Sequence, residues 1–143
     1  MIIGFTGTRE GMTELQRKKC HEIILELDPI ETHDGCDMGA DRQFFEIIDS
    51  LPTRPIIKTF GHPSTITNLS CTKGRDFIYS PEDPLVRNHA IAGSSFHPIA
   101  CPLQETEILR SGTWATIRYA TKLGIPITII SPTAVITRIN SKW

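Results

Sequence analysis

The sequence predicts an α/β fold in which helices cover both faces of a mostly parallel, doubly wound sheet of five to six strands. The first observation is that short apolar runs alternate with segments of helical periodicity from one end of the chain to the other. The second is that 143 residues, 39% of them hydrophobic, are enough for one core, and no linker-like tract divides them. We therefore expect a single domain spanning residues 1–143.

The strands are short apolar runs bounded by glycine, proline or polar residues. They are predicted at residues 2–6, 30–33, 55–60, 97–101 and 126–130, and residues 135–139 form either a sixth strand or a packed tail. Residues 61–83 are rich in Pro, Ser, Thr and Gly. This stretch is too long for a plain connection, and such loops in compact domains often belong to binding sites.

Helices are predicted between these strands from capping residues and apolar spacing. They run from Thr13 to Pro29, up to about Leu51, from Asp83 through Ile91 and from Ser111 to Leu123. Thr13 and Gln16 form a capping-box pattern, and Pro29 must stop the first helix. Gly124 and the proline that follows it end the last helix.

Composition excludes several classes of function. The 15 Lys and Arg residues are balanced by 16 Asp and Glu, so no global basic field attracts nucleic acid. No signal peptide or apolar run of about 18 residues is visible, and a cytoplasmic protein without membrane contact is expected. The four cysteines are widely spaced, which favours free thiols. The five histidines lack metal-ligand spacing, so neither a metal nor a cofactor is predicted.

Small polar residues and glycines follow the first strand, where a parallel sheet binds its ligands. The candidate ligand-binding residues here are Thr6, Gly7, Thr8, Arg9, Gly11 and Met12. Glycines let the backbone approach a ligand, successive amides before a helix form an anion site, and Arg9 adds a bidentate phosphate contact. The alternative is that Gly7 and Gly11 only permit a tight turn between strand and helix.

Two further segments occupy equivalent positions later in the chain. The candidates are Asp34, Gly35 and Cys36 after the second strand, and Ser111, Gly112, Thr113, Trp114 and Thr116 at the start of the last helix. Aspartates either accept ribose hydroxyls or cap the helix, and Trp114 either stacks on a base or packs in the core. Arg87 and Asn88 lie on an otherwise apolar short helix, where they contact a ligand or face solvent. No catalytic residue is assigned.

The chain resembles the SLOG superfamily of Rossmann-like domains, which includes the LOG phosphoribohydrolases and DNA-processing protein A. The resemblance rests on five segments in order: GFTGTREGM, HDGCDMGAD, FGHP, PLVRNHAIA and RSGTWATIRYATKLGIPI. It is strongest to small stand-alone phage and bacterial proteins that carry GTRxGM and SGTWxTIRYA. It implies a nucleotide-type pocket built from residues 6–9 with Ser111, Gly112, Thr113 and Thr116, and self-association as homodimers or higher oligomers.

One departure from the LOG pattern shapes the functional expectation. LOG enzymes carry PGGxGTxxE, and when this motif is laid on residues 111–119, Tyr119 stands where the catalytic glutamate should be. The sequence therefore favours binding of a nucleotide or nucleotide-derived signal, such as a cyclic ADP-ribose-type ligand, for sensing or for sequestration as a phage sponge against host defence. The alternatives are hydrolysis of the N-glycosidic bond of nucleoside monophosphates and, against the near-neutral charge, binding of single-stranded DNA.

Overall fold

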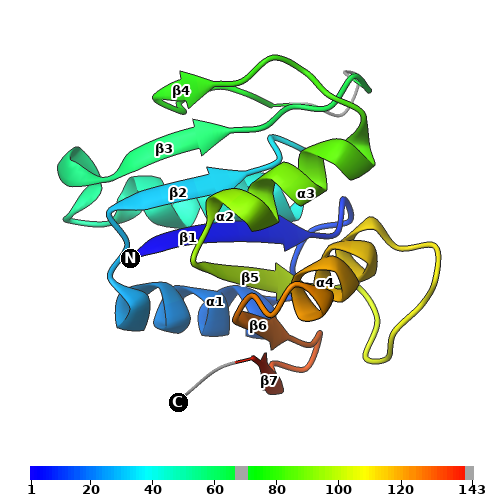
Figure 1. The fold of residues 1–143 in the computed structure, drawn as a ribbon. Coiled ribbons are helices and arrows are strands. Elements are labelled where there is room, and N and C mark those ends of the chain that lie inside the picture. The colour runs from blue at the N-terminus through cyan, green and yellow to red at the C-terminus, as the bar shows by residue number, and fades with distance from the viewer. Residues whose placement is uncertain (67–70, 141–143) are drawn as a thin grey trace.

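The computed structural model describes residues 1–66 and 71–140 as one layered α/β domain built on a single sheet (Figure 1). In chain order the elements are β1 (Ile2–Gly7), α1 (Glu14–Leu27), β2 (Glu31–Asp34), α2 (Ala40–Ser50), the 3-10 helix η1 (Arg54–Ile56), β3 (Lys58–Gly61), β4 (Phe77–Ile78), α3 (Pro84–Ser94), β5 (His97–Cys101), α4 (Gly112–Lys122), β6 (Ile127–Ile130) and β7 (Ile136–Ile139). None of the helices in this described part has the length and apolar character needed to span a membrane.

The sheet confirms the predicted class and corrects the strand count from five or six to seven. Its strand order is β4-β3-β2-β1-β5-β6-β7, and only β7 runs antiparallel to its neighbour. The additional strand is β4, which lies inside the stretch at 61–83 that the sequence presents as a connection. Phe77 and Ile78 are too few to produce a periodic signal, whereas residues 136–139 do pair with β6 as the sixth-strand option expects.

Alternate residues of β1 face the two helical layers. Ile3 and Phe5 are fully buried in the larger core cluster, together with residues of α1 and α2 such as Ile24 and Phe44. Gly4 points to the opposite face, where an added Cβ would lie 2.6 Å from the Ser95 hydroxyl of α3. The missing side chain therefore lets α3 pack closely over the centre of the sheet, and α3 and α4 cover this face together (Figure 1).

Capping residues set where the helices begin, as predicted. Thr13 accepts a hydrogen bond from the amide of Gln16, whose side chain in turn accepts from the Thr13 amide. Asp83 caps α3 and Ser111 caps α4. Because both helices start beside the carboxyl ends of the parallel strands, their positive N-terminal ends lie at the edge of the sheet where ligands bind in such folds.

Candidate functional site

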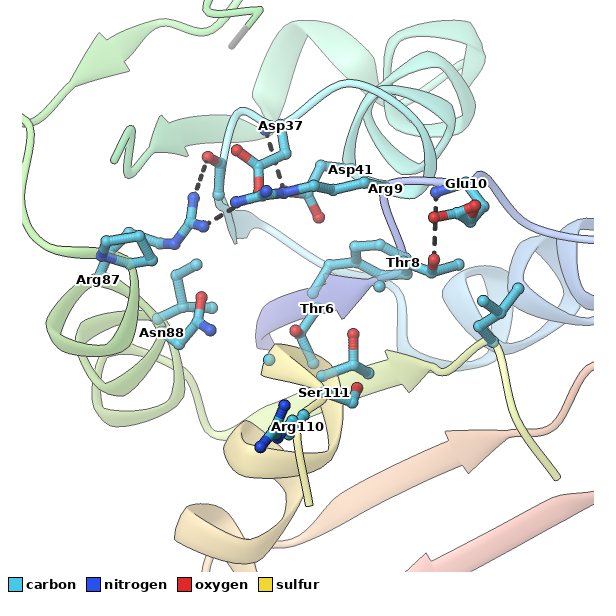
Figure 2. A pocket seen from close by; sticks show the side chains of 18 of the residues that line it. Thr6, Thr8, Arg9, Glu10, Asp37, Asp41, Arg87, Asn88, Arg110 and Ser111 are labelled. Carbon is cyan, nitrogen blue, oxygen red and sulfur yellow. Dashed lines mark hydrogen bonds and ion pairs between the residues drawn. The ribbon is translucent and has the colours of Figure 1, made fainter. Parts of the chain in front are cut away.

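A cavity of about 390 Å³ lies at the carboxyl edge of the central strands (Figure 2). This volume falls in the range of small-molecule sites. Its walls come from the loop after β1, the turn after β2, one face of α3, the connection between β5 and α4, and the first turn of α4. The lining residues are Phe5, Thr6, Gly7, Thr8, Arg9, Glu10, Gly35, Asp37, Asp41, Pro84, Arg87, Asn88, Ile91, Leu103, Gln104, Ile108, Arg110, Ser111, Gly112 and Thr113.

The loop after β1 is held in one conformation by its own backbone. The carbonyl of Thr8 accepts hydrogen bonds from the amides of Gly11 at 3.2 Å and Ala40 at 3.0 Å, and the Thr8 hydroxyl accepts from the Glu10 amide at 3.1 Å. Gly39 adopts φ of +85° and lies so close to the Arg9 carbonyl that no Cβ fits between them. The loop is therefore fixed to the start of α2, and it presents Thr8 and Arg9 to the cavity.

The first turn of α4 presents backbone donors to the same space. Ser111 accepts a hydrogen bond from the amide of Trp114 at 3.1 Å. The amides of Gly112 and Thr113 precede the first intrahelical hydrogen bond, so helix geometry offers them no acceptor. Both residues line the cavity. Together with the guanidinium of Arg110, these amides suit an anionic group.

A buried ion pair forms another wall of the cavity. The side chain of Arg87 is only 4% exposed, and its Nη2 lies 3.1 Å from Oδ2 of Asp37. Its Nη1 donates to the carbonyls of Gly35 and His62. Nε of Arg9 lies 3.7 Å from the same Oδ2, and Figure 2 shows the two arginines approaching Asp37 from different directions. Both cations therefore act on the same carboxylate oxygen of Asp37.

Unsatisfied polar atoms concentrate at this cavity. Among the described residues, five buried side-chain nitrogen or oxygen atoms have no hydrogen-bond partner. Three of them are Oδ1 of Asp37, Nε of Arg87 and Oε1 of Gln104, and all three residues line the cavity. Leaving a buried polar atom unpaired costs about 1–3 kcal/mol, so such atoms are expected where a ligand supplies the partner.

Asp41 is a carboxyl group of a different character. Burial, together with the neighbouring Asp34 and Asp37 carboxylates, raises the pKa of Asp41 well above its usual value. Its Oδ2 accepts a hydrogen bond from the Asp37 amide at 3.1 Å. Gly39, not Asp41, is the N-cap residue of α2, so the side chain of Asp41 holds the preceding turn from within the first turn of the helix.

Asp34 and Cys36 serve the protein's own structure. The Asp34 carboxylate accepts from Arg75 Nη2 at 2.8 Å and Nε at 3.2 Å, and also from the Cys36 amide at 2.8 Å. Burial opposes the positive charge of Arg75, but the neighbouring Asp34 carboxylate raises the pKa of Arg75 above its usual value. Burial raises the pKa of the Cys36 thiol to about 12, so this thiol stays protonated at neutral pH. Neither Asp34 nor Cys36 lines the cavity.

The structure brings ten of the sixteen predicted binding residues together around the cavity. These are Thr6, Gly7, Thr8, Arg9, Gly35, Arg87, Asn88, Ser111, Gly112 and Thr113. Gly11, Met12, Asp34, Cys36, Trp114 and Thr116 lie outside its lining. Their contacts with a ligand remain predictions in every case.

Three of the residues outside the lining have evident packing roles. Trp114 is 8% exposed and packs in a core cluster with Ala100 and Ile117, which is the core alternative stated for it. The Thr116 hydroxyl donates to the Gly112 carbonyl at 2.9 Å, and thus binds its own helix. Met12 belongs to the main core, and its amide donates to Gln43 at 2.6 Å.

Sequence reasoning missed the connection between β5 and α4 and half of the α3 face. Pro84 and Ile91 line the cavity with Arg87 and Asn88, at a spacing of three, four and seven residues that places all four on one helical face. That periodicity could have identified Pro84 and Ile91. Leu103, Gln104 and Ile108 come from an irregular segment, and no local pattern marks them as lining residues.

Tyr119, the residue at the position of the LOG glutamate, does not line the cavity. Its ring stacks on His89 of α3, with centroids 3.7 Å apart. Within residues 1–66 and 71–140, no three His, Cys, Asp or Glu side chains are grouped as ligands of a metal ion would be.

Comparison with solved structures shows a Rossmann-like fold. The molybdenum cofactor binding protein from the phototrophic bacterium Rippkaea orientalis superposes with a TM-score of 0.65 at 20% identity, over 91% of this chain and 76% of that one. TM1055, a structural genomics target, superposes with a TM-score of 0.61 at 14% identity, over 88% of this chain and 71% of the other. No family model and no curated protein matches the sequence. At these identities the likeness concerns the fold alone.

Proposed function

We propose that the cavity binds a nucleotide or a nucleotide-derived signalling molecule, such as a cyclic ADP-ribose-type ligand, and senses or sequesters it. The observation that carries the proposal is the gathering of unpaired buried atoms of Asp37, Arg87 and Gln104 around one small cavity. Each of these atoms needs a polar partner that the described part of the protein does not supply.

The phosphate of such a ligand fits the first turn of α4. The amides of Gly112 and Thr113 and the positive end of the helix favour an anion there. Arg110 is exposed, lines the cavity and adds a cation. Thr6 near the end of β1 and Thr8 in the loop that follows supply hydroxyl groups.

The sugar of the ligand fits the Asp37 wall. The Oδ1 atom of Asp37 is an acceptor without a partner, and the two arginines at Oδ2 orient the carboxylate. A ribose hydroxyl is a donor of suitable chemistry for this oxygen. Asn88 lies next to Arg87 on α3 and offers both a donor and an acceptor to the same ligand.

Calorimetry tests the proposal directly. Purified protein is titrated with a panel of nucleotides and cyclic ADP-ribose, and bound ligand is recovered by denaturation and identified by mass spectrometry. Gly112→Asp places a carboxylate where the phosphate is expected, in a position where an added Cβ meets only Asn88 at 3.5 Å. This variant should fold and lose binding. Gly93→Asp, whose added Cβ meets nothing within 4 Å, is the matched control. Equal binding by Gly112→Asp and the control would refute the proposal.

A second candidate function, hydrolysis of the N-glycosidic bond, is favoured by one observation. Asp37 and Asp41 line the same cavity, and burial with the neighbouring carboxylates raises the pKa of Asp41 well above its usual value. Unequal carboxyl pairs of this kind serve as acid and base in glycoside chemistry. Incubation with nucleoside monophosphates, followed by chromatography for free base, tests it. Release of base that Asp37→Asn abolishes would replace the binding proposal.

We further propose that the chain forms a homodimer or a higher homo-oligomer, as its resemblance to the SLOG superfamily implies. Analytical ultracentrifugation across a concentration series tests this directly. A single monomeric species at all concentrations would exclude it.

A further inference from the structure

We propose that Gln104 reads the heterocycle of the ligand and selects bases that carry an exocyclic amino group next to a ring nitrogen. This inference rests on the proposed function, because it assigns a role within the same cavity. It concerns the connection between β5 and α4, which the motifs of the sequence do not include.

The first support is the state of the Gln104 side chain. Its Oε1 atom is buried and has no hydrogen-bond partner in the described part of the chain, and the residue lines the cavity. Leu103 and Ile108 from the same segment, and Pro84 and Ile91 from α3, supply apolar surface to the same cavity. A planar heterocycle suits such surroundings, and a polar atom unpaired among apolar groups is the feature that would orient it.

The second support is that residues on both sides of Gln104 are hydrogen-bonded to distant parts of the chain. The carbonyl of Pro102 accepts a hydrogen bond from Gln16 Nε2 at 2.8 Å. The carboxylate of Glu105 accepts from the amide of Thr133 at 3.1 Å and from its hydroxyl at 2.9 Å. The segment that carries Gln104 is therefore attached to α1 through Pro102 and to the loop after β6 through Glu105.

The chemistry of the amide determines the class of base. In this proposal Oε1 accepts from an amino group of the base, and Nε2 donates to the adjacent ring nitrogen. Adenine and cytosine present this pair of groups. Hypoxanthine and uracil present a carbonyl oxygen and a ring N–H in the same places. Oε1 would then face another acceptor, and Nε2 would face another donor. Mismatched buried hydrogen bonds lower affinity by about tenfold or more.

Isothermal titration with five probes tests the assignment: the 5′-monophosphates of adenosine, inosine, cytidine and uridine, and ribose 5-phosphate. We expect the adenosine and cytidine compounds to bind about tenfold more tightly than the inosine and uridine compounds. Gln104→Leu keeps the size of the side chain but removes both polar groups, and should bring this ratio close to one. Gln104→Glu keeps only acceptors, which pair equally with an amino group or a ring N–H, so it should also bring the ratio close to one. Thermal unfolding of both variants checks that they remain folded.

The outcomes separate this proposal from the one on which it rests. If the nucleotides bind but the amino and carbonyl bases bind equally, or if Gln104→Leu leaves their ratio unchanged, the role of Gln104 is overturned and nucleotide binding stands. If none of the five probes binds, the role of Gln104 is overturned, and the proposed function fails with it only if cyclic ADP-ribose does not bind either.

Discussion

The rings of Tyr119 and His89 are stacked between α4 and α3, with centroids 3.7 Å apart and planes 7° from parallel. The position that carries the catalytic glutamate in LOG enzymes is thus used here to join two helices. These two helices cover one face of the sheet (Figure 1). The ring of Tyr119 therefore lies between the helices, and Tyr119 does not line the cavity.

We predict that Tyr119→Glu does not create a hydrolase. The new carboxylate would face His89 on α3 and not the cavity, and the stack, worth about 0.5–1.5 kcal/mol beyond its buried area, would be lost. Chromatography of nucleoside monophosphates incubated with the variant should show no free base. Tyr119→Phe, which preserves the stack, serves as the control for stability. Free base released by the glutamate variant would show that this position reaches the ligand.

Gly39→Ala should destabilise the protein by about 2–4 kcal/mol, because it adds a Cβ both to a positive φ and to a backbone contact. The Cβ would collide with the carbonyl of Arg9, which belongs to the loop that lines the cavity. Urea unfolding measures the change. Gly93→Ala is the matched control, since it lies within α3 with open space around it and should stabilise by about 0.5–1 kcal/mol. Similar effects at both glycines would contradict this account.

The parts of the structure that the sequence predicts are those governed by local rules. Alternation of strand and helix identifies the sheet, and caps such as Thr13, Asp83 and Ser111 place the helix starts. The glycine-containing segments after β1, after β2 and at the start of α4 lie at the ends of these predicted elements. Most of the cavity-lining residues in these segments were therefore predictable as well.

The remainder depends on contacts between distant residues. β4 forms because Phe77 and Ile78 pair with β3, and not because two residues have a strand pattern. The ion pair joins Asp34, a predicted binding residue, to Arg75, which lies 41 positions further along the chain. Gln104 lines the cavity because of the course of the irregular segment between β5 and α4. No spacing rule reports such contacts.

Asp41→Asn should raise the stability of the protein at neutral pH. An unfolded Asp loses its proton near its ordinary pKa of 3.8, while burial raises the pKa of Asp41 in the folded state. The folded protein therefore holds this proton to a higher pH than the unfolded chain, so stability falls as pH rises above about 3.8. Asparagine removes this penalty and can still accept from the Asp37 amide. Melting temperatures from pH 3 to pH 8 should diverge in favour of the variant as pH rises; parallel curves would contradict the assignment.

His62 should make the protein less stable in mild acid. Burial, with the charges of His33 and Arg87, lowers the pKa of His62 from 6.5 to about 4. The unfolded chain takes up a proton below about pH 6.5 but the folded chain does not, so stability is lost as pH falls from 6.5 to about 4, by on the order of 3 kcal/mol.

His62→Gln tests this dependence, because glutamine does not titrate and can still donate to Nδ1 of His33, which His62 approaches at 2.8 Å. Urea unfolding at pH 7 and pH 4.5 should show a smaller loss for the variant than for the natural protein. The variant should still lose some stability between pH 7 and pH 4.5, because burial lowers the pKa of His97 as well. An unchanged difference between the two pH values would show that His62 is not the group responsible.

Arg118 should control ligand affinity without entering the cavity. From α4 it donates to the Glu107 carboxylate at 2.6 Å and to the carbonyls of Ile108 at 3.3 Å and Leu109 at 3.2 Å. These contacts hold the segment that brings Ile108 and Arg110 to the ligand. Arg118→Met removes the contacts that hold this segment. The ligand must then order the segment when it binds, and this ordering lowers the net binding free energy.

We therefore expect Arg118→Met to weaken nucleotide binding several-fold in calorimetry. Its effect on unfolding free energy should stay near 1 kcal/mol, as exposed ion pairs contribute little. Arg42→Met removes a comparable exposed pair, in which Arg42 Nε lies 3.2 Å from Glu46, on a helix surface outside the cavity lining. Loss of affinity in Arg118→Met alone would identify the segment between β5 and α4 as a positioned part of the site. Equal affinity of the two variants would show that the segment holds its place through Pro102 and Glu105 alone.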